Sequence, residues 1–122
     1  MKYLLLLNNS TDDTRFWETL SEEEAGKLRS QEIPKWSDLF AWLGQKGIEP
    51  EGLELDGPGK AKTIRVRDNQ VLVTDGPHAE TKEQIGGYFL VDLGNLDEAI
   101  EFAARVPVAQ KGSVEIRPLN ET

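Results

Sequence analysis

Two short apolar runs without polar interruption predict strands at the centre of a β-sheet. They cover residues 3–7 and 88–91. A strand that is buried on both faces shows no alternation, and runs of this length are too short for a buried helix. Two further strands are predicted at the segments 48–55 and 114–117. In the second of these, Val114 and Ile116 alternate with charged residues before Pro118.

The segment 63–74 predicts a β-hairpin with a two-residue turn at positions 68–69. Before this turn, Ile64 and Val66 alternate with arginines, so one face of the hairpin is apolar and the opposite face is largely polar. Arg65 and Arg67 belong to the polar face. The residues predicted to lie opposite each other are Val66 with Val71 and Ile64 with Val73.

A first helix is predicted to begin at Ser21, because Ser21 and Glu24 have the spacing of a capping box. Pro34 predicts a kink or a restart, since proline cannot donate the backbone hydrogen bond of a helix interior. Gly44 and Gly47 supply the stop signal. The predicted apolar stripe consists of Trp36, Leu39, Phe40 and Leu43. Trp42 falls outside this stripe, so we expect it to be exposed or at an interface.

A second helix is predicted after Asn95, which has the capping spacing with Glu98. Val106-Pro107 ends it. Its predicted buried stripe consists of Leu96, Ala99, Ile100 and Ala103. Residues 8–19 are polar apart from two aromatic side chains and are expected to form a loop.

The predicted order is strand, helix, strand, hairpin, strand, helix, strand. This order indicates an α+β fold, a ferredoxin-like β-α-β-β-α-β split unit with an inserted β-hairpin. Two helices would cover one face of the antiparallel sheet. The other face needs cover as well, so we expect a homodimer packed sheet to sheet. We expect one domain over residues 1–122, since no repeat or linker divides the chain.

The net charge of the chain indicates which kinds of binding partner are disfavoured. The chain has 22 acidic and 14 basic residues and a net charge of −8, which disfavours nucleic acid and anionic membranes. Without cysteine there is no disulfide, thiolate nucleophile or thiolate metal site. The apolar run at residues 3–7 is too short for a signal peptide or a membrane span, so a cytoplasmic location is expected.

Residues 63–119 resemble the YCII-related family, in its DGPF subgroup. The matching segments are 63–67, 73–77, 79–83, 86–88, 96–99 and 112–115. The resemblance implies a ferredoxin-like dimer of the type called a dimeric α+β barrel. Some relatives carry out small-molecule chemistry, such as dehydrochlorination of a hydroxylated aromatic ring. Others occur beside or fused to extracytoplasmic-function sigma factors, which implies a regulatory role.

Two positions depart from the family pattern. The subgroup has Phe after Asp-Gly-Pro, where this chain has His78. In the broader family, a His on the first helix pairs with an Asp as the proposed dyad. The predicted first helix of this chain contains no His. The dyad therefore cannot be transferred, and any imidazole chemistry depends on His78.

The loop between the hairpin and the strand at 88–91 holds the candidate site. Histidine exchanges a proton near neutral pH, carboxylates orient it or act as bases, and lysine neutralises a carboxylate or phenolate. Loops between strands commonly carry such chemistry. The candidate catalytic residues are His78, Asp75 and Glu80. The candidate ligand-binding residues are Lys82, Glu83, Gly86, Gly87 and Tyr88.

Each of these residues also has a purely structural interpretation. Asp75-Gly76-Pro77 is a turn sequence, and the same tripeptide recurs at residues 56–58 without reactive neighbours. His78 fits a role as a ring that fills the Phe position, and the 80–83 charges fit a solvated turn. Gly86-Gly87 predicts a bulge or a close backbone approach, and Tyr88 fits a core position.

The sequence thus predicts a small-molecule-binding protein with acid–base lyase or isomerase chemistry at the 74–88 loop. The alternatives are a non-catalytic regulatory or ligand-sensing module and an oligomeric scaffold. No cofactor is expected, since Gly-rich phosphate-binding loops are absent from the sequence. No metal site is expected either, because one histidine and scattered carboxylates lack the required spacing.

Overall fold

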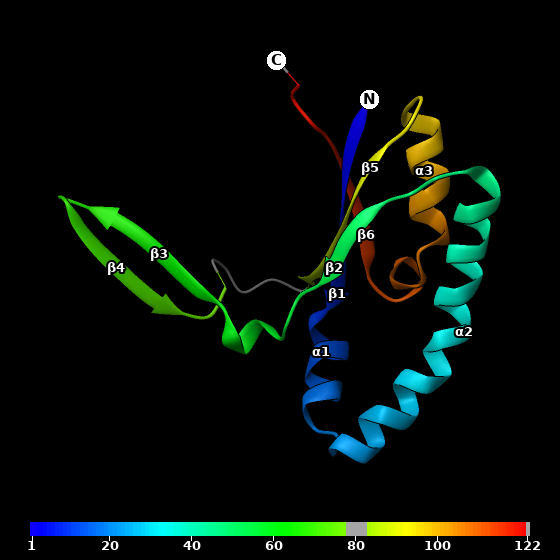
Figure 1. Ribbon diagram of the computed structural model, residues 1–122. Coiled ribbons are helices and arrows are strands. Elements are labelled where there is room, and N and C mark those ends of the chain that lie inside the picture. Colours follow the sequence, from blue (N-terminus) through cyan, green and yellow to red (C-terminus); the bar gives the residue numbers. More distant parts are fainter. Residues whose placement is uncertain (78–82, 122) are drawn as a thin grey trace.

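The computed structural model describes residues 1–77 and 83–121 of this chain. It contains a four-stranded antiparallel sheet in the order β2-β5-β1-β6 (Figure 1). The strands are β1 (Lys2–Ser10), β2 (Glu51–Glu54), β5 (Glu83–Asp92) and β6 (Ser113–Pro118). The two central strands, β1 and β5, are those that contain the two apolar runs. The order and directions agree with the predicted ferredoxin-like α+β fold.

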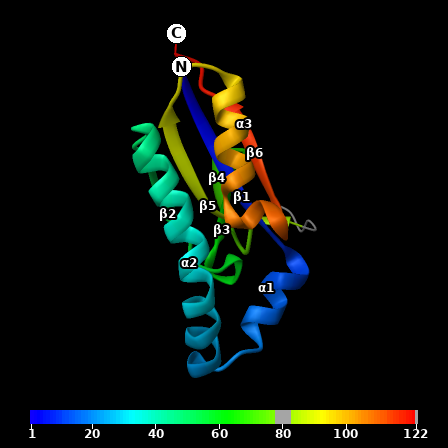
Figure 2. The ribbon, with the colours of Figure 1, turned by 90° about the vertical axis from the view of Figure 1, so that its right-hand side faces the viewer.

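Three α-helices accompany this sheet in the described part of the chain: α1 (Thr11–Glu18), α2 (Glu22–Lys46) and α3 (Leu96–Arg105). Figure 2 shows α2 and α3 side by side over one face of the sheet. Two short 3₁₀ helices, η1 (Pro58–Lys60) and η2 (Pro107–Gln110), lie in the connections. The face away from α2 and α3 is called the open face below.

The core lies between the sheet and these two helices. In β1, Tyr3, Leu5 and Leu7 are buried under the helices, whereas Leu4 and Leu6 on the open face are only partly buried. The absence of alternation in this strand thus reflects an open face that is itself apolar. The other buried residues are Leu39, Leu43, Phe89, Val91, Leu93, Ala99, Phe102, Ala103 and Val106.

Helix α2 begins with the predicted capping box, in which Ser21 Oγ accepts from the Glu24 N–H and Glu24 Oε1 accepts from the Ser21 N–H. Gly47 ends the helix in the left-handed region at φ 71°. The helix continues through Pro34, so the predicted restart is wrong. Leu39 and Leu43 are buried as predicted, whereas Phe40 is half exposed.

Replacing Ser21 by alanine is expected to lower the free energy of unfolding by about 1 kcal/mol, because the Ser21 hydroxyl caps a free backbone N–H. Chemical denaturation measures this loss. Ser30→Ala in the same helix is the matched control. Its hydroxyl bonds back to the Gly26 carbonyl within the helix, so its loss should be neutral or slightly stabilising. Equal losses for both variants would contradict the capping role.

The same cap makes the contribution of Glu24 depend on pH. The hydrogen bond from the Ser21 backbone N–H, reinforced by the Ser21 hydroxyl, lowers the pKa of Glu24. A carboxylate with a lowered pKa stabilises the fold above its unfolded-state pKa. That contribution disappears as the pH falls through the lowered value.

The predicted loop at residues 8–19 is wrong, because β1 extends to Ser10 and α1 follows directly. Ser10 Oγ accepts from the Asp13 N–H at 3.0 Å, and two aspartates lie in the first turn of α1. Both features favour a helix start. The capping signal, a serine followed by two aspartates, is present in the sequence. The many polar residues of this segment favoured the prediction of a loop instead.

Helix α3 begins at the Asn95 cap and ends before Val106-Pro107 as predicted, but its buried face was assigned incorrectly. Leu96 and Ile100 are 49% and 50% exposed, whereas Phe102 is fully buried beside Ala99 and Ala103. The stripe that packs on the sheet is therefore turned toward Phe102. The ring of Phe102 lies 5.3 Å from that of Phe89 on β5, and this contact accounts for the choice of face.

The tryptophans of α2 lie at the edge of this core. Trp36 and Trp42 are both partly buried and pack against it. Trp42 is thus not fully exposed, because the guanidinium of Arg105 covers its ring at 4.4 Å from the centroid. The alternative, a place at an interface, stays a prediction.

The inserted hairpin consists of β3 (Lys62–Arg67) and β4 (Gln70–Asp75), which form a separate two-stranded sheet. Its register is the predicted one, with Val66 opposite Val71 and Ile64 opposite Val73. Asp68 and Asn69 both have positive φ, at 50° and 64°. Two successive positive values are the feature of a type I′ turn, which suits the twist of a hairpin. Figure 1 shows the hairpin projecting away from the rest of the chain.

Candidate functional site

A cavity of about 580 Å³, wide open to solvent, lies where the hairpin joins the main sheet. This volume is within the range of small-molecule sites. Its walls come from the β2–β3 connection and from the start of β5. The lining residues are Leu55, Asp56, Gly57, Pro58, Lys60, Ala61, Pro77, Glu83, Gln84 and Ile85. A smaller cavity of about 230 Å³ lies beside Trp42, between the end of α2 and the start of α3.

Glu83 belongs both to this cavity and to a side-chain network on the open face. The Ser113 hydroxyl donates to Glu83 Oε1 at 2.9 Å, and Asn8 Nδ2 donates to Ser113 Oγ at 3.4 Å. The three residues come from β5, β6 and β1. Each is partly buried, so the Glu83 carboxylate is held in a fixed position at the edge of the cavity.

The Gly86-Gly87 pair lies at a bulge in the pairing of β1 with β5, where the register shifts between Leu7 and Asn8. A Cβ at Gly86 would lie 2.0 Å from Asn9 Nδ2, and one at Gly87 would lie 3.2 Å from the Leu53 carbonyl oxygen. The prediction of a bulge is therefore confirmed, whereas the approach of a ligand or of a partner subunit at these glycines stays a prediction. The neighbours that approach these glycines belong to the chain itself, and their role in binding a ligand stays a prediction.

Tyr88 follows this bulge on β5. It is partly buried and lies opposite Leu6 on one side and Leu53 on the other. These neighbours place the tyrosine on the open face rather than in the core beneath the helices. Its position next to the bulge suits either a ligand contact or the predicted sheet-to-sheet interface.

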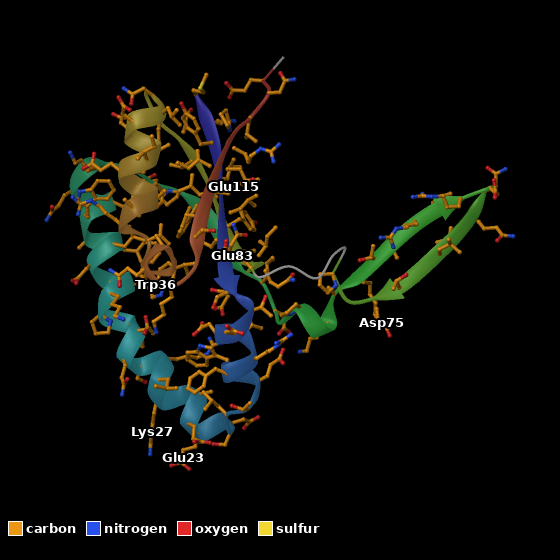
Figure 3. All side chains as sticks on the ribbon, turned by 180° about the vertical axis from the view of Figure 1, so that it is seen from behind. Glu23, Lys27, Trp36, Asp75, Glu83 and Glu115 are labelled. Atoms are coloured by element: carbon orange, nitrogen blue, oxygen red, sulfur yellow. The ribbon has the colours of Figure 1, made fainter. Side chains whose placement is uncertain are left out.

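Asp75 lies at the end of β4, where its side chain is 84% exposed and forms an ion pair with Lys62. Figure 3 shows it on the hairpin, apart from Glu83 on the main sheet. Gly76 follows with a φ of 94°, and its carbonyl oxygen accepts from Thr63 Oγ1 at 2.8 Å. The positive φ of Gly76 fits the turn-building interpretation of the tripeptide, whereas Asp75 contacts Lys62 on the neighbouring strand. The catalytic assignment of Asp75 stays a prediction, and His78, Glu80 and Lys82 lie outside the described residues.

The second Asp-Gly-Pro tripeptide lines the same cavity, which the sequence alone did not indicate. Asp56 Oδ2 accepts from Lys60 Nζ at 2.8 Å, and Asp56 Oδ1 accepts from the Gly57 N–H. The hydrogen bond from Lys60 lowers the pKa of Asp56 and in turn raises the pKa of Lys60. Both groups therefore stay charged around neutral pH, and a carboxylate of lowered pKa is a weak general base.

Asn8 and Ser113 are the site residues that sequence reasoning missed. Ser113 belongs to the matching segment 112–115 and Asn8 to the predicted loop at residues 8–19, but the two residues are 105 positions apart in the sequence. Within residues 1–77 and 83–121, His, Asp and Glu side chains form no group of three suited to a metal ion. Among the described helices, none has both the length and the apolar character needed to span a membrane.

Comparison with known proteins gives the family. The YCII-related domain matches residues 1–122, beyond the segments that carried the resemblance. The chain is also 48% identical over 125 residues to an uncharacterised protein of Rhizobium meliloti (strain 1021), covering 98% of this chain and 92% of the relative. This chain belongs to the YCII-related family.

Proposed function

We propose that this protein binds a small phenolic compound in the cavity at the base of the hairpin and acts on it by acid–base chemistry. The observation that carries the proposal is the fixed carboxylate of Glu83 at the edge of that cavity. An apolar cavity with a few oriented polar groups is the usual form of a small-molecule site.

The chemistry of the walls favours a phenol over a simple carboxylate. Leu55, Pro58 and Ile85 offer apolar surface for an aromatic ring, and Glu83 offers an acceptor for its hydroxyl. A carboxylate ligand would instead meet the negative charges of Glu83 and Asp56. Of the lysines, Lys60 is already paired with Asp56, so a charged ligand would depend on Lys82.

In the catalytic form of this proposal, the reaction is that of a lyase or an isomerase. Glu80 or His78 takes a proton from a carbon of the bound ring system. The electron pair left behind either expels a leaving group from the neighbouring carbon, as in a lyase, or takes up a proton at another carbon, as in an isomerase. Asp75 orients the imidazole, and Lys82 balances the negative charge of a phenolate. Gly86, Gly87 and Tyr88 shape the end of the site. The alternative is a ligand-sensing module of the kind associated with sigma factors, which binds the same compound without changing it. A further alternative is an oligomeric scaffold, which would bind no small molecule.

Phenol itself is the probe for the first test. Adding it to the ¹⁵N-labelled protein should give saturable shifts of the Ala61, Gln84 and Ile85 amide signals, with a dissociation constant on the order of 1 mM. Glu83→Gln should weaken binding about tenfold, because a hydrogen bond to a charged acceptor is stronger than one to a neutral amide.

Glu115→Gln is the matched control for this experiment. Glu115 lies on β6 and pairs with Arg117, and it does not line the cavity. Its substitution should leave phenol binding unchanged. Equal weakening by both variants, or shifts that never saturate, would overturn the proposed site. Phenol has no group to eliminate, so turnover is tested with a chlorinated phenol. Its recovery unchanged would favour sensing over catalysis.

The proposed assembly is a homodimer formed through the open face of the main sheet. Leu4, Leu6, Tyr88 and Leu90 give this face a continuous apolar centre across β1 and β5. When two copies related by two-fold symmetry pack their open faces together, the apolar centre of one face is buried against the apolar centre of the other. We also propose that the protein is cytoplasmic. We further propose that it belongs to the DGPF subgroup of its family, which the matching segments of the sequence support.

A further inference from the structure

The hairpin has little support from its own chain. In the part of the chain that the structure describes, β3 and β4 pair with each other and with no strand of the main sheet. Figures 1 and 3 show them extending well beyond the sheet and helices. A lone two-stranded hairpin is marginally stable in water, so a hairpin of this kind requires a surface to pack against.

One face of the hairpin is apolar and exposed. Ile64, Val66, Val71 and Val73 share this face by their register, and they are 54–65% exposed. Together they form an apolar patch on the order of 300 Å², similar to the largest patch of an ordinary monomer. The patch alone is smaller than the roughly 800 Å² per partner that a stable interface buries. It therefore fits as an extension of a larger interface.

The charge of the hairpin is opposite to that of the rest of the chain. The hairpin, residues 62–75, carries three basic side chains (Lys62, Arg65 and Arg67) and two acidic ones (Asp68 and Asp75). The whole chain has 14 basic and 22 acidic residues, so the remainder has eleven basic and twenty acidic. A segment of net charge +1 is thus attached to a body of net charge −9. A second copy of this chain is a partner of complementary charge.

The direction of the hairpin indicates where that copy lies. In Figure 1, α2 and α3 lie on one side of the main sheet and the hairpin projects on the other, the side of the open face. A second copy seated on the open face would occupy the space beside the hairpin. Two-fold symmetry then places the hairpin of each copy along the flank of the other.

We propose that the β3–β4 hairpin is a dimerisation arm, whose apolar face of Ile64, Val66, Val71 and Val73 packs against the second copy. This inference rests on the dimer of the proposed function and extends it. The arm adds apolar area and opposite charge to an interface whose centre is the open sheet face. The base of each arm borders the ligand cavity, so the assembly also determines what surrounds that cavity.

The test is sedimentation equilibrium of the full chain and of a variant with four substitutions, Ile64→Thr, Val66→Thr, Val71→Thr and Val73→Thr. Threonine keeps the β-branched shape and strand preference while removing the apolar face. The variant should dimerise at least about 100-fold more weakly than the natural chain. The control is Leu72→Thr, on the opposite face of the same hairpin, which should keep the natural dimer affinity.

Hydrogen exchange of the natural chain provides a second measurement that needs no substitution. The β3 and β4 amides should be protected above the dissociation constant and lose protection on dilution, while the β1 and β5 amides stay protected. A four-threonine variant that dimerises as tightly as the natural chain would overturn the arm alone. A natural chain that stays monomeric at all concentrations would overturn both the arm and the sheet-to-sheet dimer.

Discussion

Replacing Phe102 by alanine is expected to lower the free energy of unfolding by about 3–5 kcal/mol. Phe102 is fully buried on α3, and its ring lies 5.3 Å from that of Phe89. The ring centroid of Phe89 in turn lies 6.5 Å from that of Trp36 and 6.4 Å from that of Phe40, both on α2. The ring of Phe102 thus helps to join both helices to β5, and its removal leaves a cavity where three elements meet. Urea denaturation measures the loss.

Ile100→Ala on the same helix is the matched control. Ile100 is half exposed, so its truncation should cost less than about 1 kcal/mol. The comparison also tests the orientation of α3, because the sequence pattern alone placed Ile100 in the buried stripe. A larger loss for Ile100 than for Phe102 would mean that α3 is rotated or that another copy covers Ile100.

Replacing Gly112 by alanine is the second substitution with a large expected effect. A Cβ at this position would lie 2.0 Å from the Asn8 backbone carbonyl oxygen. Backbone at that distance cannot give way as a flexible side chain would, so β1 and β6 would have to separate at this end. The expected loss is about 1–3 kcal/mol in the free energy of unfolding.

This substitution should also weaken phenol binding. Separation of the strands would lengthen the contact between Asn8 and Ser113 and release the Glu83 carboxylate that Ser113 holds. The control is Gly26→Ala in the first half of α2, where nothing lies within 4 Å of the added methyl group. It should stabilise the protein by about 0.5–1 kcal/mol, since alanine favours the helix more than glycine. A Gly112→Ala protein of natural stability and affinity would contradict the close approach.

Local signals predicted much of this fold, because several of its elements are determined by neighbours in the sequence. The capping box at Ser21 and the hairpin register around positions 68–69 involve residues only a few positions apart. The buried face of α3 could not be predicted in this way. Ala99 and Ala103 belong to two overlapping stripes, one with Ile100 and one with Phe102. The aromatic ring of Phe89 on another strand decides between them.

The candidate site was predicted in part for the same reason. Glu83, Gly86, Gly87 and Tyr88 are neighbours on one strand, so the segment that contains them was visible in the sequence. The network that fixes Glu83 also needs Asn8 and Ser113, which the sheet brings together from opposite ends of the chain. No local pattern reports such a contact. The second tripeptide, at residues 56–58, was set aside as a turn and in fact lines the cavity.

The proline within α2 divides this helix into two parts of unequal stability. Both buried residues of α2, Leu39 and Leu43, lie after Pro34, on the part that packs on the sheet. The part before Pro34 carries the cap but none of the buried residues, and proline removes one hydrogen bond between the two parts. We therefore expect local opening to be more frequent in the first turns of α2, so that their amide hydrogens exchange faster with solvent than those of the turns after Pro34.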